Sequence, residues 1–198
     1  EQFPIKTAQK PMLFADGNNT TPLTITEENN KLDIQGQNFH VDFNLTDGSI
    51  GKLQYDGINV FKPECGPHLN AYRAFTNNDN WIYNNWFKNG LHNLNHKVLN
   101  YERTKNSNGS ITMVFTILSQ APNAAHHEGG TDMNTRGKYY SRIVEDVNKP
   151  FGKDDFHFVT KQIYTVHLDG SIELQSCITT SKSSLILPRS GYQMQVTD

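Results

Sequence analysis

The sequence predicts an all-β fold, a sandwich of antiparallel strands. Three hairpins with tight, glycine-containing turns support this prediction, because such turns join neighbouring antiparallel strands. The hairpin arms alternate apolar and polar residues, as expected for strands with one buried face. A single short segment, residues 81–88, has the features of a helix.

Residues 1–30 predict an extended connector from a preceding β-sandwich domain. Three prolines and a polar run interrupt this stretch, which shows little periodicity. We therefore expect the β domain to occupy residues 31–198. On this interpretation the chain is a piece of a longer polypeptide.

The β domain is predicted to begin with an antiparallel meander. Short turns around Asp47-Gly48 and Asp56-Gly57 separate its strands. The strands are expected at residues 31–35, 39–43, 50–55 and 58–61.

Two longer hairpins are predicted downstream. In the first, residues 96–105 turn at 106–109 and return through 111–118. In the second, residues 156–168 turn at Asp169-Gly170 and return through 172–178.

The predicted helix at residues 81–88 would place Trp81, Asn85 and Lys88 on one face, and Gly90 would end it. The polar stretch 119–155 interrupts the strand rhythm, so we expect a loop or an elaborated hairpin end there. Excursions of that length in compact domains are usually functional or disordered.

The composition argues against nucleic-acid and membrane partners. The net charge is −2 and acidic and basic residues are interspersed, so no basic surface that would follow phosphates is expected. No apolar run approaches the roughly 20 residues needed to cross a bilayer. We expect a soluble protein, and the sequence does not fix its compartment.

The two cysteines, Cys65 and Cys177, are far apart and have no zinc-site spacing. We expect both to be buried free thiols, since free cysteine packs as a small hydrophobic residue.

No convincing pair of catalytic carboxylates is present, so no catalytic residue is assigned. Glycoside hydrolysis needs two such groups, but the adjacent acids at 145–146 and 154–155 are expected on the solvated surface. His126, His127 and Glu128, with Asp132 nearby, have metal-ligand chemistry. Adjacent side chains on an extended segment point to opposite sides, so a polar loop is preferred and no metal site is assigned.

An aromatic group follows residue 80, formed by Trp81, Tyr83, Trp86 and Phe87. Aromatic residues carry large apolar area, so we expect most of them to lie in the core. The alternative is that Trp81 or Tyr83 faces a carbohydrate ring.

Two segments resemble signatures of the C-terminal small-chain domain of family 2 glycoside hydrolase β-galactosidases. Residues 69–80, LNAYRAFTNNDN, resemble the signature F/Y-R-A-P-T-D-N-D, and residues 187–192, LPRSGY, resemble L-P-R-x-G. The match departs at Phe75, where the family usually has proline, and at Asn77, where it usually has aspartate. The resemblance runs from about Leu32 to the C-terminus.

The resemblance implies a galactose-mutarotase-like supersandwich, incomplete at its C-terminus. It implies a parent enzyme that hydrolyses terminal non-reducing β-D-galactosides with retention. The catalytic glutamates of such enzymes lie in a separate (β/α)₈ barrel, so this chain alone is expected to be inactive.

The resemblance also implies which partners to expect: a galactoside substrate, other domains of the same polypeptide and further copies of the enzyme. It implies no cofactor in this chain, with Mg²⁺ and Na⁺ bound by other domains of the parent enzyme. The implied compartment is the bacterial cytoplasm or periplasm.

The resemblance places the first signature near the mouth of the active site. We prefer a bidentate pair between Arg73 and Asp79 that fixes this loop over direct contact with sugar. Replacing proline by Phe75 removes a fixed φ, so the loop is expected to leave the family's path. The candidates for the substrate rim are Arg73, Asn77, Asn78, Asp79, Trp81 and Tyr83.

Two other functions remain open. A free-standing carbohydrate-binding module would use the aromatic residues and asparagines without catalysis. A mutarotase-type epimerase would need a histidine acid and a carboxylate base at one sugar centre, with His157 and His167 as the candidate histidines.

Overall fold

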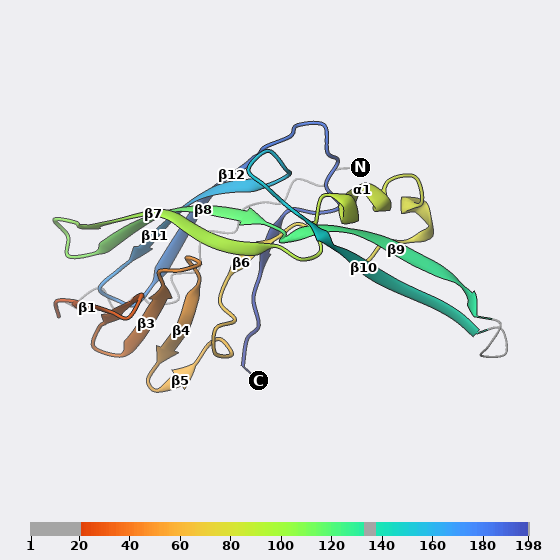
Figure 1. Cartoon of the computed structure of the whole chain (residues 1–198). Helices are drawn as coiled ribbons and strands as arrows, with labels where there is room; N and C mark the ends of the chain where they lie inside the picture. The colour runs from red at the N-terminus through yellow and green to blue at the C-terminus, as the bar shows by residue number, and fades with distance from the viewer. Residues whose placement is uncertain (1–20, 133–137, 198) are drawn as a thin grey trace, which may run out of the picture.

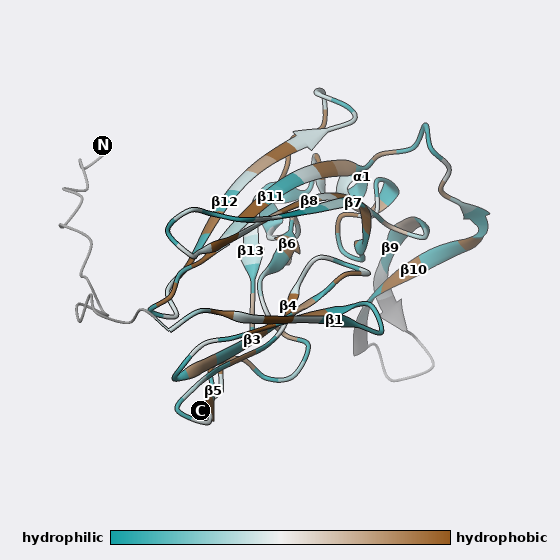
Figure 2. Ribbon diagram, turned by 90° about the vertical axis from the view of Figure 1, so that its left-hand side faces the viewer, coloured by the Kyte–Doolittle hydropathy of each residue, from teal (hydrophilic) through white to brown (hydrophobic). Residues whose placement is uncertain are grey.

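In the computed structural model, which describes residues 21–132 and 138–197, antiparallel sheets stack face to face with one short α-helix beside them (Figure 1). The predicted all-β sandwich is confirmed. In Figure 2 the first sheet lies beneath the second, and apolar residues occur along the strands of both. Among the described residues, no helix is long and apolar enough to cross a membrane.

The first sheet is a five-stranded meander in which the strands pair in chain order. Asp56 and Gly57 both have positive φ, as a tight hairpin turn requires. Its strands are β1 (Thr24–Glu28), β2 (Lys31–Gln35), β3 (Phe39–Asn44), β4 (Ile50–Tyr55) and β5 (Ile58–Asn59).

This sheet begins earlier in the sequence than we expected. Strand β1 pairs along its whole length with β2, and Leu23 just before it belongs to the buried core. The polar sequence of β1 obscured the strand, because β1 is an edge strand with mostly exposed side chains. Residues 1–20 of the predicted connector lie outside the described residues.

The second sheet has four strands in the order β12-β11-β8-β7. Both long hairpins predicted from the sequence are present in it. The burial of β8 alternates strictly along its length, so every second side chain enters the core. The strands are β7 (Asn95–Lys105), β8 (Ile111–Gln120), β11 (Phe158–Val166) and β12 (Ile172–Thr180).

The main core lies between these two sheets. Phe43 of β3 stacks on Phe115 of β8 with ring centroids 6.2 Å apart, and Tyr164 of β11 meets Phe43 edge-on at 5.0 Å. All three side chains are almost fully buried. We call the cluster of buried apolar residues around them the sandwich core.

A second, separate cluster lies beneath helix α1 (Tyr83–Lys88), and we call it the loop core. The helix is shorter than predicted, and the side chains it buries are Trp86 and Phe87. Of the predicted shared face, Asn85 and Lys88 lie on α1, whereas Trp81 precedes the helix, and all three side chains are exposed. Gly90 ends the helix with φ of +69°, as expected.

The described residues of the stretch 119–155 form an elaborated hairpin, the second of the two expected alternatives, and residues 133–137 lie outside the description. Strands β9 (Asn123–Asp132) and β10 (Lys138–Pro150) form a separate ribbon that extends away from the sandwich, with α1 against β9 (Figure 1).

Neither cysteine is buried, which corrects the expectation. Both are free thiols, but Cys65 is half-buried and Cys177 is exposed. Cys177 lies opposite the exposed Lys161 in the β11–β12 register, so it belongs to the outer face of the sheet.

Candidate functional site

The two signature segments lie side by side, although more than a hundred residues separate them. Strand β6 (His68–Asn70) leads into the first signature and pairs with β13 (Gly191–Gln193), which contains the end of the second. Asn70 Nδ2 also donates a hydrogen bond to Gln193 Oε1 at 2.7 Å. The second signature therefore anchors the strand from which the first loop departs.

The first signature forms a loop held by a single carboxylate. Arg73 donates from Nη1 to Asp79 Oδ2 at 2.7 Å and from Nη2 to Asp79 Oδ1 at 2.9 Å. The Thr76 backbone N–H and hydroxyl group both donate to Asp79 Oδ2 as well, at 2.7 and 3.0 Å. The predicted bidentate pair is present, and it closes the loop across six residues.

These hydrogen bonds change the acidity of Asp79. Donation by Arg73, followed by that from the Thr76 backbone, holds the pKa of the Asp79 carboxyl far below its usual range. The pKa of the Arg73 guanidinium is raised by the same hydrogen bond. Both groups are therefore charged at neutral pH, and neither is poised to transfer a proton.

Arg73 also connects the loop to the loop core. Its guanidinium lies 5.3 Å from the centroid of the Trp86 ring, within cation–π range. Trp86 is itself fixed, because its indole N–H donates to the carbonyl oxygen of Ile186 at 3.0 Å. Ile186 directly precedes the second signature, so one tryptophan links both signatures.

Phe75, which stands where the family usually has proline, is an aromatic anchor. Its ring stacks on Tyr83 of α1 with centroids 4.4 Å apart, and His127 of β9 meets it edge-on at 4.9 Å. The contact with His127 joins the loop to the middle of β9. Side-chain packing here takes over the restraint that a proline ring would give the backbone.

The predicted rim residues divide into two groups. Arg73 and Asp79 are committed to bracing the loop, and Tyr83 is half-buried in its stack with Phe75. The remaining three are exposed on or beside the short 3₁₀ turn Asn77–Asp79. They are Asn77, Asn78 and Trp81, the last with 72% of its surface accessible.

These exposed side chains offer two complementary kinds of contact. Each asparagine amide has donors and an acceptor, which match the hydroxyl groups of a sugar. The Trp81 ring is a flat apolar face, and aromatic side chains combine such a face with a polar edge. We call Asn77, Asn78 and Trp81 the exposed rim.

His126 and His127 lie on a strand rather than in the predicted polar loop, and they point to opposite sides. His126 Nε2 lies 3.3 Å from Glu128 Oε1, whereas His127 Nε2 lies 2.8 Å from Ser141 Oγ. Glu128 is also held by Arg142, which lowers the pKa of the Glu128 carboxyl. Among the described residues, no three His, Cys, Asp or Glu side chains gather as a metal site. The Asp132 side chain lies outside the described residues.

The acidic pairs and the epimerase candidates do not converge on one centre. Glu145 accepts a hydrogen bond from Asn93, and Asp155 accepts one from the backbone of Gly152. His157 and His167 flank opposite ends of β11, with His157 Nδ1 against the carbonyl oxygen of Asp155.

Sequence reasoning missed a cavity of about 240 Å³, lined by both polar and apolar side chains, that opens between the two sheets. Among its lining residues are Thr160 and Gln162, which occupy the buried register of β11. Two polar residues at successive core positions of a predicted strand were the available signal.

One family model matches most of the chain. A model of the family described as "Beta galactosidase small chain" matches residues 35–198. The matched range includes both signature segments, the loop core and every strand from β3 onward. No curated protein matches the chain.

Proposed function

The chain belongs to the β-galactosidase small-chain family, and from this we propose that it is the C-terminal domain of a retaining family 2 β-galactosidase. The substrates of that enzyme are terminal non-reducing β-D-galactosides. In the proposal this domain packs on the catalytic barrel and contributes the exposed rim to the sugar site. The parent enzyme forms oligomers, and its Mg²⁺ and Na⁺ are bound by other domains.

The observation that carries the proposal is the braced signature loop. The loop presents two asparagines and a tryptophan to solvent, so it needs rigid support. Groups that position a substrate contribute most to catalysis when their geometry is fixed before the substrate binds. Asp79 supplies that support by accepting four hydrogen bonds from Arg73 and Thr76. In this role Arg73 is a positioning residue, and the exposed rim makes the contacts with sugar.

The proposal assigns no catalytic group to this chain. Retaining hydrolysis needs an acid and a nucleophile about 5–5.5 Å apart. Of the acids considered from the sequence, Glu145 is hydrogen-bonded to Asn93 and Asp155 to the backbone of Gly152. The glutamates of the barrel therefore perform the chemistry, and this domain shapes the pocket that they act in.

A complementation assay tests this division of labour. The chain is assayed on a chromogenic β-galactoside alone, and then mixed with the upstream remainder of its gene product. We expect hydrolysis only in the mixture. Turnover by the chain alone would contradict the assignment of catalysis to another domain.

A carbohydrate-binding module is the second candidate, favoured by the 72% exposure of the Trp81 ring. A rim that makes only two or three contacts binds a sugar too weakly to measure on its own. Those contacts do not offset the translational and rotational freedom that is lost on association. Saturable binding of a galactoside to the isolated chain, lost in Trp81→Ala, would therefore favour the module. Absence of activity in the complementation mixture would also favour the carbohydrate-binding module.

A further inference from the structure

The cavity between the sheets lies where the two apolar clusters meet. Ile117 of the sandwich core and Leu69 of the loop core both line it. Its volume is about 240 Å³, whereas a single water needs only about 10–15 Å³. The cavity is therefore large enough for a small organic molecule.

The wall formed by the four-stranded sheet is polar, although it occupies the core register of that sheet. Thr160 and Gln162 share one face of β11 with buried Phe158 and Tyr164, and they are only 1% and 3% exposed. Ser119 of β8 is fully buried beside them. Burying polar groups is unfavourable unless they are hydrogen-bonded. The Ser119 hydroxyl group has a partner in His96 Nδ1 at 2.8 Å, so Thr160 and Gln162 are the two that need an explanation.

Two of these side chains each carry a buried oxygen atom that has no hydrogen-bond partner in the described part of the chain. Among the described residues, no group hydrogen-bonds to Thr160 Oγ1 or Gln162 Oε1. Gln162 is nevertheless held in place, because its Nε2 donates to the hydroxyl group of Tyr192 at 3.0 Å. The unpartnered oxygen atoms can accept hydrogen bonds, and the threonine can also donate one.

Two imidazoles extend the polar lining. The rings of His68 and His96 lie 5.8 Å apart, and both residues line the cavity. Burial lowers the pKa of His96, so its ring is neutral at pH 7. His68 Nδ1 lies 3.1 Å from the carbonyl oxygen of Gly66, which can only accept, so Nδ1 is the donor in this hydrogen bond.

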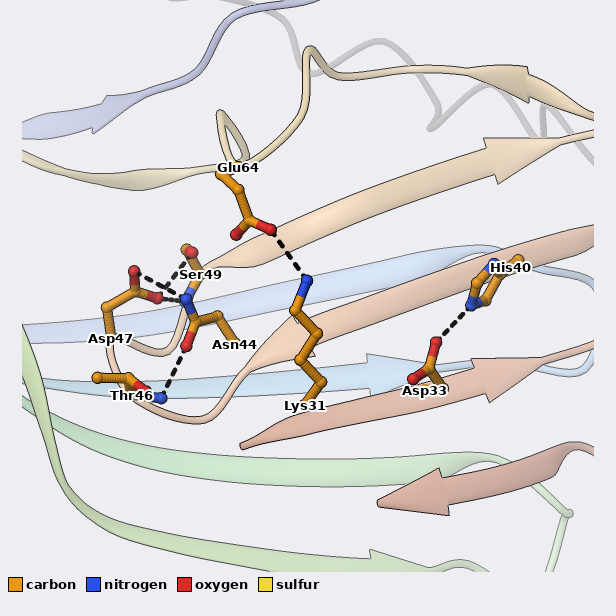
Figure 3. A network of polar contacts seen from close by, with 8 residues as sticks. All are labelled: Lys31, Asp33, His40, Asn44, Thr46, Asp47, Ser49 and Glu64. Carbon is orange, nitrogen blue, oxygen red and sulfur yellow. Dashed lines mark hydrogen bonds and ion pairs between the residues drawn. The ribbon is translucent and has the colours of Figure 1, made fainter. Parts of the chain in front are cut away.

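The charges around the cavity disfavour anionic ligands. Its lining includes no lysine or arginine, while Asp47 and Glu64 would repel an anion. Both carboxylates are already engaged, Asp47 with Ser49 and Glu64 with Lys31 at 3.0 Å (Figure 3).

We propose that this cavity is a second binding site, separate from the exposed rim, for a neutral polyhydroxylated ring of about one sugar unit. Hydroxyl groups both donate and accept, so they match a lining of hydroxyls, an amide oxygen and imidazoles. The apolar side chains of Leu69, Leu94 and Ile117 contact the C–H face of such a ring. The site goes beyond the role proposed for the signature loop and does not depend on it.

The test is an NMR titration of the full chain with D-galactose, followed at the imidazole signals of His68 and His96. We expect saturable shifts of both signals, with a Kd on the order of 1–10 mM. Sodium sulfate, as an anionic control, should leave both signals unchanged. Absence of a saturable galactose shift would overturn the proposal.

The decisive variant is Thr160→Val, which keeps the side-chain shape and removes an unpartnered buried hydroxyl group. Such a change should leave the melting temperature unchanged or raised, so loss of folding does not confuse the result. We expect at least a fivefold weaker affinity for galactose, while the control Thr179→Val, on the exposed part of β12, keeps the wild-type affinity.

The variant Trp81→Ala distinguishes galactose binding in the cavity from binding at the exposed rim. The cavity proposal expects galactose affinity at the His68 and His96 signals to be unchanged in this variant. If Trp81→Ala abolishes the shifts while Thr160→Val does not, the sugar binds at the rim and the cavity proposal is wrong. That result would leave the complementation test of the proposed function unaffected.

Discussion

The sandwich core and the loop core stabilise the same chain in different ways. The sandwich core joins two sheets whose strands contribute every second side chain, as in β8. The loop core instead gathers aromatic side chains from the signature loop, α1 and the start of β11. Regular alternation supplies stability, whereas the irregular cluster fixes the geometry of the signature loop.

Disruption of the sandwich core should have the largest effect. Phe115 is fully buried and its ring contacts Phe43, Tyr101 and Tyr164. Phe115→Ala should lower the free energy of unfolding by about 3–5 kcal/mol, measured by urea denaturation. That loss is a large part of the stability of a typical domain.

The control is Leu99→Ala on β7, which removes a side chain from a residue that is 53% exposed. It should change the free energy of unfolding by less than about 0.5 kcal/mol. Equal losses in the two variants would mean that the sandwich core is not the main source of stability.

Removal of the loop brace should have a smaller effect. Arg73→Ala takes away both hydrogen bonds to Asp79 and the contact with Trp86. We expect the melting temperature to fall by several degrees, as measured by differential scanning calorimetry. The exposed Arg189→Ala should leave it unchanged. An unchanged melting temperature in Arg73→Ala would refute the bracing role.

The same brace predicts a specific pH dependence. The pKa of Asp79 is lowered in the folded state, so its charge stabilises the fold above the unfolded pKa of about 3.9. This contribution is lost as the pH falls below that value toward the folded pKa.

Asp79→Asn removes the titrating group and shows this contribution by difference. The gap in melting temperature between wild type and the variant should be full at pH 7 and narrow progressively below about pH 4. A gap that stays constant down to pH 2 would show that the charge of Asp79 is not its source.

The contrast between the two clusters also explains what the sequence could predict. Alternation and Asp-Gly turns identified the meander and both long hairpins, because these signals are local. The bidentate pair of Arg73 and Asp79 was predictable for the same reason, since only six residues separate them. The pairing of β6 with β13 and the bond from Trp86 to Ile186 link distant segments, and no local pattern encodes them.

Sequence patterns also could not predict how exposed each side chain is. Trp81 and Trp86 have the same side chain and lie five residues apart, yet one is 72% exposed and the other 2%. The difference depends on the way in which α1 packs onto the loop core. In the same way, the alternation of β11 identified its buried face but not the cavity beside Thr160.

The smallest expected effect on stability belongs to the exposed rim, and there the central claim is tested most directly. In the complementation mixture, kcat/KM for a chromogenic β-galactoside is measured with wild-type chain, Trp81→Ala and the control Ile58→Ala, whose side chain is equally exposed at 73%. We expect Trp81→Ala to lower kcat/KM about fivefold, equivalent to about 1 kcal/mol, with an unchanged melting temperature. Ile58→Ala should match wild type. Equal kcat/KM for all three proteins would contradict the claim that the signature loop presents Trp81 to the sugar.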